Sequence, residues 1–243
     1  MRYHRIMMKL SGGAMSGAFR DQQTWGFDPT AINHIADEIL HLHNEGIQVA
    51  VMVGGGNIFR GELADKWKIE RAEADNIGMM ATVINCLLLR GVLQSRGDAE
   101  VRVMTAIPIN AVAEPYIRLR AIRHLEHQFI VLLAGGTGNP YVTTDYPAVQ
   151  RALELRAEAL LAAKNGTDGI YSNDPNKDPA AQRYQSISYN KVIVDNLKVL
   201  DQAAVLLARD HHLPIHVFDF NATGLMYRIC CGEEIGTHIV EDV

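Results

Sequence analysis

Three glycine-rich segments of the sequence contain the groups best suited to bind phosphate. Residues 9–13 (KLSGG) combine an ammonium group, a hydroxyl and exposed backbone amides. In residues 54–57 (GGGN), three successive residues without Cβ let a backbone approach a ligand closely, and Arg60 follows within reach to hold phosphate oxygens bidentately. Residues 135–140 (GGTGNP) form a third loop. Each segment alone is unspecific, because glycine at a strand end is often only a turn and a surface arginine usually forms a solvated ion pair.

Strands and helices must position these segments. Each segment directly follows an apolar run expected to be a strand, at Ile6–Leu10, Val49–Val53 and Phe129–Ala134. Further strands are expected at Val101–Thr105 and Ala159–Ala163. Helices are expected at Pro29–Asn44 (with Asp28 as N-cap), Ala72–Gln94 (with Asp75 in its first turn), Glu114–Glu126 and Pro147–Ala157. A loop is expected at Asp168–Pro179. Alternating strands and helices without hairpins predict an α/β fold with a mostly parallel sheet covered on both faces. Ligands bind such sheets at the carboxyl ends of the strands, where the glycines are concentrated.

Composition limits the function classes. The chain has 243 residues, 48% of them hydrophobic and 21% charged, which is typical of a globular protein. A net charge of −5 argues against general binding to nucleic acid. We expect no signal peptide and no 18-residue apolar stretch able to span a membrane. We also expect a reduced cytoplasmic setting, because the three cysteines lack zinc spacing and Cys86 lies in an apolar run expected to be core.

Several common catalytic motifs are absent from the sequence. No lysine follows a glycine, so a Walker A motif cannot be written, and the HRD, DFG and HExxH motifs are missing. We interpret His124 and His127 as a solvated helix face, and His211-His212 as a helix end. The carboxylates of interest are those of Asp75, Asp145, Asp174 and Asp201, although any one of them is more often a cap or a surface residue.

The order of the motifs is more specific than any one of them. KLSG, GGGNIFRG, AEADNIGMMATVIN, GGTGNPYVTTD, DGIYSNDPNKDP and KVLDQAAVLLARDHHLPIHVF follow one another between Tyr3 and Ile239. This arrangement closely resembles the bacterial UMP kinase branch of the amino acid kinase family. The resemblance implies a three-layer α/β/α sandwich on a mostly parallel sheet. It also implies one domain over residues 1–243, with UMP and oligomer contacts on the side of residues 1–164 and ATP on the side of residues 165–243.

The resemblance also implies site residues, position by position. Lys9 and Arg60 would stabilise the migrating phosphoryl group, and Asp201 would orient the cations. The implied ATP-binding residues are Lys9, Leu10, Ser11, Gly12, Gly56, Arg60, Asn165, Tyr171 and Asp174. The implied UMP-binding residues are Gly55, Asp75 at the ribose hydroxyls, and Thr137, Gly138, Asn139, Pro140, Tyr141, Val142, Thr143 and Thr144 around the uracil.

By the same resemblance, the expected reaction is transfer of the γ-phosphate of ATP to UMP, with Mg²⁺ bound through the ATP phosphates. A homohexamer and feedback inhibition by UTP are expected too. Gly13 replaces the usual glutamate, Ala18–Trp25 replaces a segment linked to GTP activation, and the role of Lys164 stays open. Two alternatives are a family member acting on a carboxylate or carbamate, and a non-catalytic binding protein on the same fold.

Overall fold

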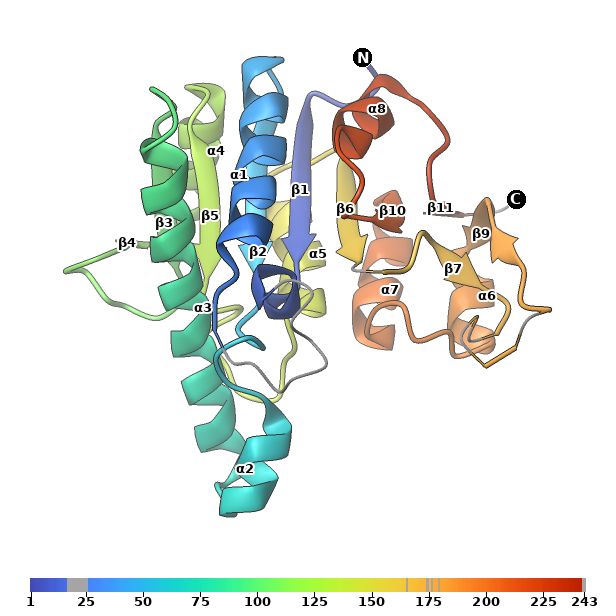
Figure 1. The fold of residues 1–243 in the computed structure, drawn as a ribbon, viewed down its shortest axis with the longest axis horizontal. Helices are drawn as coiled ribbons and strands as arrows, with labels where there is room; N and C mark the ends of the chain where they lie inside the picture. The colour runs from blue at the N-terminus through green and yellow to red at the C-terminus, as the bar shows by residue number, and fades with distance from the viewer. Residues whose placement is uncertain (17–25, 165, 174, 176, 179, 242–243) are drawn as a thin grey trace.

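The computed structural model describes the chain except for residues 17–25, 165, 174, 176, 179 and 242–243 (Figure 1). The implied Asn165 and Asp174, and the whole Ala18–Trp25 segment, therefore lie outside the described residues. The elements are β1 (Arg5–Leu10), the 3₁₀ helix η1 (Gly12–Ser16), α1 (Pro29–Asn44), β2 (Gln48–Val53), α2 (Gly61–Trp67), α3 (Arg71–Gln94), β3 (Val101–Thr105), β4 (Glu114–Pro115), α4 (Arg118–Glu126), β5 (Ile130–Ala134), α5 (Asp145–Glu154), β6 (Ala159–Lys164), β7 (Ile170–Tyr171), β8 (Arg183–Tyr184), β9 (Ser186–Ser188), α6 (Tyr189–Val194), α7 (Gln202–Asp210), β10 (Ile215–Asp219), α8 (Leu225–Cys231) and β11 (Thr237–Val240).

Nine strands of the described chain form one sheet in the order β4-β3-β5-β2-β1-β6-β10-β11-β9. Neighbouring strands pair in parallel, apart from the antiparallel β10 and β11. In Figure 1, β1, β5 and β6 accordingly point the same way. The short strands β7 and β8 pair separately as an antiparallel ribbon. The predicted mostly parallel sheet is confirmed.

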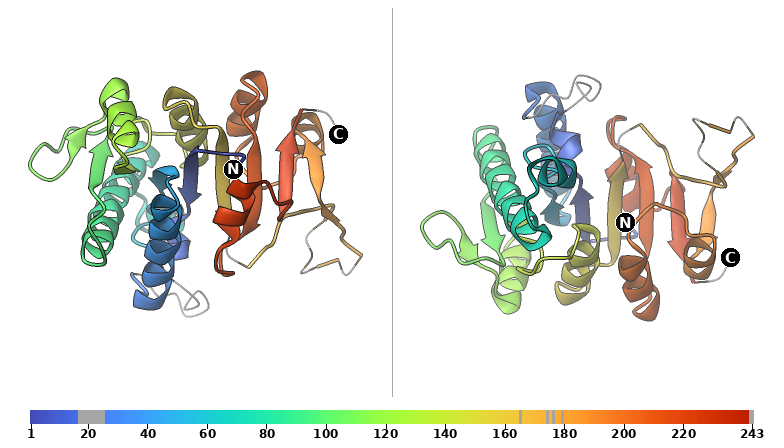
Figure 2. Two further views of the ribbon diagram at one scale, coloured as in Figure 1. Left: turned by 90° about the horizontal axis from the view of Figure 1, so that it is seen from above. Right: turned by 90° about the horizontal axis from the view of Figure 1, so that it is seen from below.

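Helices cover both faces of the sheet, which makes three layers (Figure 2). One hydrophobic core joins the strands to α1, α3 and α8, and the other joins them to α4, α5, α6 and α7. Within β1, Ile6, Met8 and Leu10 face the first core and Met7 the second, as the two-residue repeat of a strand requires. The same alternation directs Lys9 to the face covered by α5.

Helix α1 shows how local sequence sets the element boundaries. Oδ1 of Asp28 accepts hydrogen bonds from the backbone N–H of Thr30 at 2.8 Å and of Ala31 at 3.4 Å, which satisfies donors that the first turn leaves free. Pro29 occupies the first helical position, where its missing N–H costs nothing. The predicted helix Pro29–Asn44 and its N-cap are both confirmed.

Other predicted boundaries were wrong. Helix α4 begins at Arg118 and not at Glu114, because Glu114 and Pro115 extend beside Met104 and Thr105 as β4. Helix α3 begins at Arg71, which places Asp75 in its second turn. Helix α5 covers Asp145–Glu154 and not Pro147–Ala157, and the predicted loop after residue 168 contains β7.

The long helix α3 corrects another expectation. Its 24 residues include an 18-residue window with a mean hydropathy of 1.5, so by length and composition it could cross a membrane. In this fold, however, 44% of that window is buried, and Val83, Cys86 and Leu89 pack in the first core. The apolar character of α3 therefore fits a helix that packs against the sheet.

Candidate active site

The three glycine-rich segments meet at one edge of the sheet. They follow β1, β2 and β5, which are neighbouring parallel strands, so their carboxyl ends share that edge. The backbone N–H of Gly54 donates to the carbonyl of Leu10 at 2.9 Å. A Cβ on Gly12 would lie 2.3 Å from the nitrogen of Gly56, so this approach requires glycine. The first two turns are thus in direct contact.

A buried pair of amides fixes the second turn. Nδ2 of Asn57 donates to Oδ1 of Asn85 at 3.0 Å, and Nδ2 of Asn85 donates to Oδ1 of Asn57 at 2.7 Å. Nδ2 of Asn85 also donates to the carbonyl of Gly54 at 2.7 Å. Since both side chains are at most 2% exposed, these bonds replace water and hold the turn to α3.

A cavity of about 380 Å³ opens beside these turns, and we call it the central cavity. It is lined by Met52, Val53, Gly55, Gly56, Phe59, Arg60, Gly61, Asp75, Gly78, Met79, Thr82, Gly136, Val142, Thr143 and Thr144. Most of its lining residues are glycines, threonines and apolar residues, whereas its charged groups are Arg60 and Asp75. Such a cavity can hold a ligand that has both an anionic end and hydroxyl groups.

Arg60 and Asp75 have defined orientations in the central cavity. Nε of Arg60 donates to the carbonyl of Gly56 at 2.7 Å, which ties the guanidinium to the second turn. Oδ2 of Asp75 accepts from the backbone N–H of Tyr141 at 2.7 Å and pairs with Nε of Arg71 at 2.9 Å. The carboxylate of Asp75 therefore joins α3 to the 137–144 segment.

A cluster of charges lies where β1 ends under α5. Nζ of Lys9 is 2.7 Å from Oδ1 of Asp145, and Lys9 is only 8% exposed. Oδ2 of Asp145 accepts from the backbone N–H of Asp201 at 3.1 Å. The hydroxyl of Thr143 donates to Oδ2 of Asp201. The Asp145 carboxylate thus links Lys9 to the backbone of Asp201, and the Asp201 carboxylate in turn is held by Thr143.

A second cavity, of about 510 Å³, lies beside this cluster under the C-terminal part of the sheet, and we call it the lateral cavity. Its lining residues are Lys164, Thr167, Gly169, Ile170, Tyr171, Ser172, Asn173, Pro175, Asp195, Asn196, Leu197, Lys198 and Val199. The hydroxyl of Tyr171 donates to Oδ1 of Asp168 at 2.7 Å, and this hydrogen bond raises the pKa of Tyr171. The lateral cavity contains both apolar and polar groups, as a nucleoside site would need.

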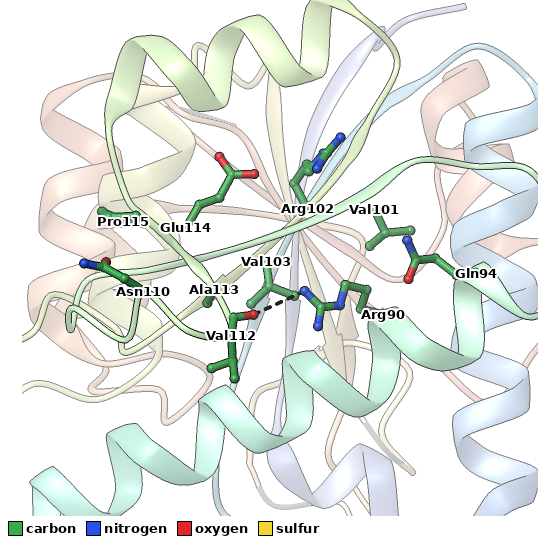
Figure 3. Close-up of a pocket in the computed structure, with 10 residues that line it drawn as sticks. All are labelled: Arg90, Gln94, Val101, Arg102, Val103, Asn110, Val112, Ala113, Glu114 and Pro115. Atoms are coloured by element: carbon green, nitrogen blue, oxygen red, sulfur yellow. Dashed lines mark hydrogen bonds between the residues drawn. The ribbon is translucent and has the colours of Figure 1, made fainter.

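A third cavity, of about 540 Å³, lies at the outer edge of the sheet between α3, β3 and the segment leading into β4 (Figure 3). Nη1 of Arg90 donates there to the carbonyl of Val112 at 3.3 Å. Its lining contains no residue of the three glycine-rich segments. The glycine-rich segments therefore indicate the central cavity, which Gly55, Gly56 and Gly136 line, and not this third cavity.

The histidine interpretation was wrong in part. His124 is largely covered: its Nε2 is 3.0 Å from Oε2 of Glu114, and its side chain is only 17% exposed. His127 is exposed and contacts the carbonyl of Arg123. No group of three His, Cys, Asp or Glu side chains in the described part of the chain could hold a metal ion by itself.

The structure brings only some of the implied site residues together. The central cavity is lined by Gly55, Gly56, Arg60, Asp75, Val142, Thr143 and Thr144. The lateral cavity is lined by Tyr171, and the charge cluster contains Lys9 and Asp201. Thr137, Gly138, Asn139, Pro140 and Tyr141 do not line the central cavity. The Leu10 side chain is fully buried in the core, so only its backbone can face a ligand.

Asp145 in the charge cluster and Lys164 beside the cluster have no assigned role in the sequence interpretation. Asp145 was noted only as a carboxylate, although it contacts Lys9 directly. Lys164 lies at the end of β6, beside β1, and its role was left open. A signal for Lys164 was present, because a lysine that ends an apolar strand in a parallel sheet lies at the ligand-binding edge.

Comparison with known proteins defines the class. A model of the amino acid kinase family matches residues 4–219. The chain therefore belongs to the amino acid kinase family. It is 54% identical over 238 residues to a uridylate kinase of Frankia alni, and the match covers 98% of this chain and 91% of that protein. It is 43% identical over 242 residues to a uridylate kinase of Limosilactobacillus reuteri, and the match covers 100% of this chain and 99% of that protein.

Solved structures agree with this class. A UMP kinase from Bacillus anthracis superposes with a TM-score of 0.96 at 53% identity, covering 100% of this chain and 98% of that one. A UMP kinase from Ureaplasma parvum has a TM-score of 0.90 at 32% identity, covering 99% and 100%. Within the amino acid kinase family, the chain belongs to the bacterial-type uridylate kinases. The expected three-layer fold and family are confirmed.

Proposed function

We propose that this chain is an enzyme that transfers the γ-phosphate of ATP to UMP, giving UDP and ADP. One observation carries the proposal: the charge cluster lies between two cavities. Thr143 lines the central cavity and donates to Asp201, while Val199, two residues before Asp201, lines the lateral cavity. Two ligands in these cavities would meet at Lys9. The kinases of similar sequence described above support this assignment.

Charge neutralisation is the main catalytic task in this reaction. The attacking group is a phosphate oxygen that is already largely ionised at neutral pH, so a strong general base is not needed. The barrier comes instead from the repulsion between two anions. The ammonium of Lys9 and the guanidinium of Arg60 would stabilise the migrating phosphoryl group, because donors that are already held in position need little reorganisation as charge develops. Their fixed positions rest on Asp145 and on the carbonyl of Gly56.

The donor set fits a magnesium ion that is held mainly by substrate. Mg²⁺ commonly binds through one or two carboxylates together with nucleotide phosphates. Asp201 offers a carboxylate beside Asp145, whereas the described residues contain no complete protein cage. We propose that Asp201 orients a Mg²⁺ ion bound through the ATP phosphates, where the ion supplies neutralisation of phosphate charge.

Acceptor and donor sides divide near residue 165 in this proposal. Residues 1–164 hold UMP, with Asp75 accepting from the ribose hydroxyls and the 137–144 segment surrounding the uracil. Residues 165–243 hold ATP, with Tyr171 near the adenine nucleotide. Asp75 and Tyr171 line different cavities, which supports this division.

A coupled assay tests the proposal directly. The purified chain is incubated with ATP and Mg²⁺ and with UMP, CMP, carbamate or N-acetylglutamate, and ADP release is followed. We expect turnover with UMP alone. Carbamate and N-acetylglutamate lack the phosphate for Lys9 and Arg60 and the ribose for Asp75, whereas CMP has both but carries a 4-amino donor where uracil offers a carbonyl acceptor to the 137–144 segment. Turnover with carbamate or acetylglutamate instead would favour another branch of the family, and no turnover with any acceptor would favour a non-catalytic binding protein.

Assembly and regulation are part of the same proposal. We propose a cytoplasmic homohexamer that UTP inhibits, as the family resemblance implies. Light scattering measures the assembly, and a monomeric mass would contradict it. Initial rates at increasing UTP measure the inhibition, and unchanged rates at millimolar UTP would contradict that part alone.

A further inference from the structure

Lys164 is a partly buried cation that the mechanism above does not use. It is the last residue of β6, and its place in the strand repeat puts it on the same face of the sheet as Lys9. Burial lowers the pKa of Lys164, and the nearby charge of Lys9 lowers it further, whereas Asp145 and Asp201 raise it. A cation placed at such a cost needs a compensating contact.

That contact is with the backbone that leads into α7. Nζ of Lys164 donates to the carbonyl of Val199. Val199 is followed two residues later by Asp201, whose backbone N–H donates to Oδ2 of Asp145 at 3.1 Å. Oδ1 of Asp145 in turn pairs with Nζ of Lys9 at 2.7 Å. Three polar contacts and the backbone from Val199 to Asp201 thus join Lys164 to Lys9 without direct contact between the two ammonium groups.

We propose that Lys164 is a positioning residue: by binding the Val199 carbonyl, it holds the 199–201 backbone so that Asp201 keeps Asp145 aligned on Lys9. This inference rests on the proposed phosphoryl transfer. Misplacing a group that neutralises developing charge by about 1 Å can cost about 100-fold in rate, so a remote anchor of this kind affects turnover. The effect falls on kcat, because the alignment of Lys9 serves the transferred group.

Direct binding of nucleotide by Lys164 is the alternative that the test must separate. Lys164 also lines the lateral cavity, where an ammonium could contact phosphate oxygens as a point charge. Direct binding requires the positive charge, whereas holding a carbonyl requires only a hydrogen-bond donor of sufficient reach. Direct binding also affects the KM for ATP, whereas positioning acts through Asp145.

The experiment compares Lys164→Met, Lys164→Gln and Lys164→Arg with the wild type in steady-state kinetics for ATP and UMP. The matched control is Lys191→Met, which removes a half-exposed lysine paired with Asp195. Circular dichroism verifies the fold of each variant. A double-mutant cycle adds Asp145→Asn alone and together with Lys164→Met.

We expect Lys164→Met to lower kcat about 10- to 100-fold with the KM for ATP within twofold. Lys164→Arg should recover most of kcat and Lys164→Gln part of it, because both side chains donate hydrogen bonds. In the Asp145→Asn background, adding Lys164→Met should lower kcat further by less than threefold. Three results would each overturn the inference. The first is a wild-type kcat in Lys164→Met, and the second is additive losses of kcat in the double-mutant cycle. The third is a raised KM for ATP together with a kcat of Lys164→Gln no higher than that of Lys164→Met. An inactive wild type would instead overturn the proposed function.

Discussion

The ammonium nitrogen of Lys9 lies 2.7 Å from Oδ1 of Asp145, and the two side chains are only 10% and 15% exposed. The pair joins the end of β1 to the first residue of α5, 136 positions later in the chain. Because the Lys9 side chain is held by an ion pair shielded from water, its proposed action on a phosphate needs little reorganisation. Lys9 is therefore the first residue to test.

Replacing Lys9 with methionine should leave the fold intact and lower kcat by at least about 10²–10³, because one fixed donor to developing charge is lost. Stopped or coupled assays of UMP phosphorylation measure kcat, and far-UV circular dichroism verifies the fold. The control Lys191→Met should keep kcat within twofold. Near-normal turnover of a folded Lys9→Met protein would refute the role of Lys9.

Replacing Asp75 with asparagine should raise the KM for UMP about tenfold, because a carboxylate accepts from two hydroxyls and an amide offers one acceptor oxygen. The same change should have a smaller effect on 2′-deoxyUMP, which lacks one of the hydroxyls. The exposed Glu73→Gln, on the same helix, serves as the control. Equal losses for both nucleotides would show that Asp75 acts only through its contacts with Tyr141 and Arg71.

Replacing Gly12 with alanine should disrupt the contact between the first two glycine turns. The new Cβ would lie 2.3 Å from the nitrogen of Gly56 and 2.8 Å from that of Asn57, and both are backbone atoms that must move. We expect a loss of about 1–3 kcal/mol in the free energy of unfolding and a fall in kcat/KM of at least about tenfold.

Urea titration and steady-state kinetics measure the two effects of Gly12→Ala. Gly91→Ala is the control, because a Cβ there meets no atom within 4 Å. In that exposed helical position, alanine should be neutral or slightly stabilising. A Gly12→Ala protein with wild-type stability and activity would show that the turns tolerate separation.

A stacked histidine pair predicts how stability depends on pH. The ring centroids of His216 and His238 lie 4.3 Å apart, with an angle of 9° between the ring planes. Nε2 of His216 is 3.1 Å from the hydroxyl oxygen of Tyr3. Burial lowers the pKa of His216 from 6.5 to about 3, and the charges of His238 and Arg2 contribute. The folded state therefore favours neutral His216. The contribution of neutral His216 to the free energy of unfolding is complete above pH 6.5. It is lost as the pH falls from 6.5 towards 3, by up to about 1.4 kcal/mol per pH unit.

Urea unfolding at pH 7 and pH 5, at one protein concentration, checks this prediction. His216→Gln should show a shallower loss of unfolding free energy between the two pH values than the wild type, since glutamine does not titrate. His211→Gln, at the exposed end of α7, should behave like the wild type. Identical pH slopes for the wild type and His216→Gln would contradict the assignment to His216.

The glycine turns and the parallel sheet could be predicted from the sequence because their signals are local. Apolar runs of β-strand length, each ending in glycine, set both the strands and their direction. The error at α4 was also local in origin: the segment from Glu114 reads as helical, but pairing with Met104 and Thr105 overrides that preference. Tertiary contacts decided the boundary.

The family resemblance implies roles for Lys9 and Asp201, but the contacts within the charge cluster could not be predicted, because they join distant parts of the chain. Asp145 precedes a helix in the sequence and looked like an ordinary cap, while Lys164 had no visible partner. Only the strand order, with β6 beside β1, brings Lys164 near Lys9. The strand repeat does predict that Lys9 and Met7 share a face, but not which helix covers it.

The pairing of β6 with β10 limits how the protein can move. Leu160 through Lys164 align with Ile215 through Asp219, and this hydrogen-bonded ladder joins the proposed acceptor half, residues 1–164, to the proposed donor half, residues 165–243. A rotation of one half against the other would break that ladder, unlike in enzymes whose two domains close about a flexible hinge. Any approach of two bound molecules must therefore come from rearrangement of the loops at the strand ends, while the separation of the cavities stays set by the spacing of the strands, about 4.8 Å each.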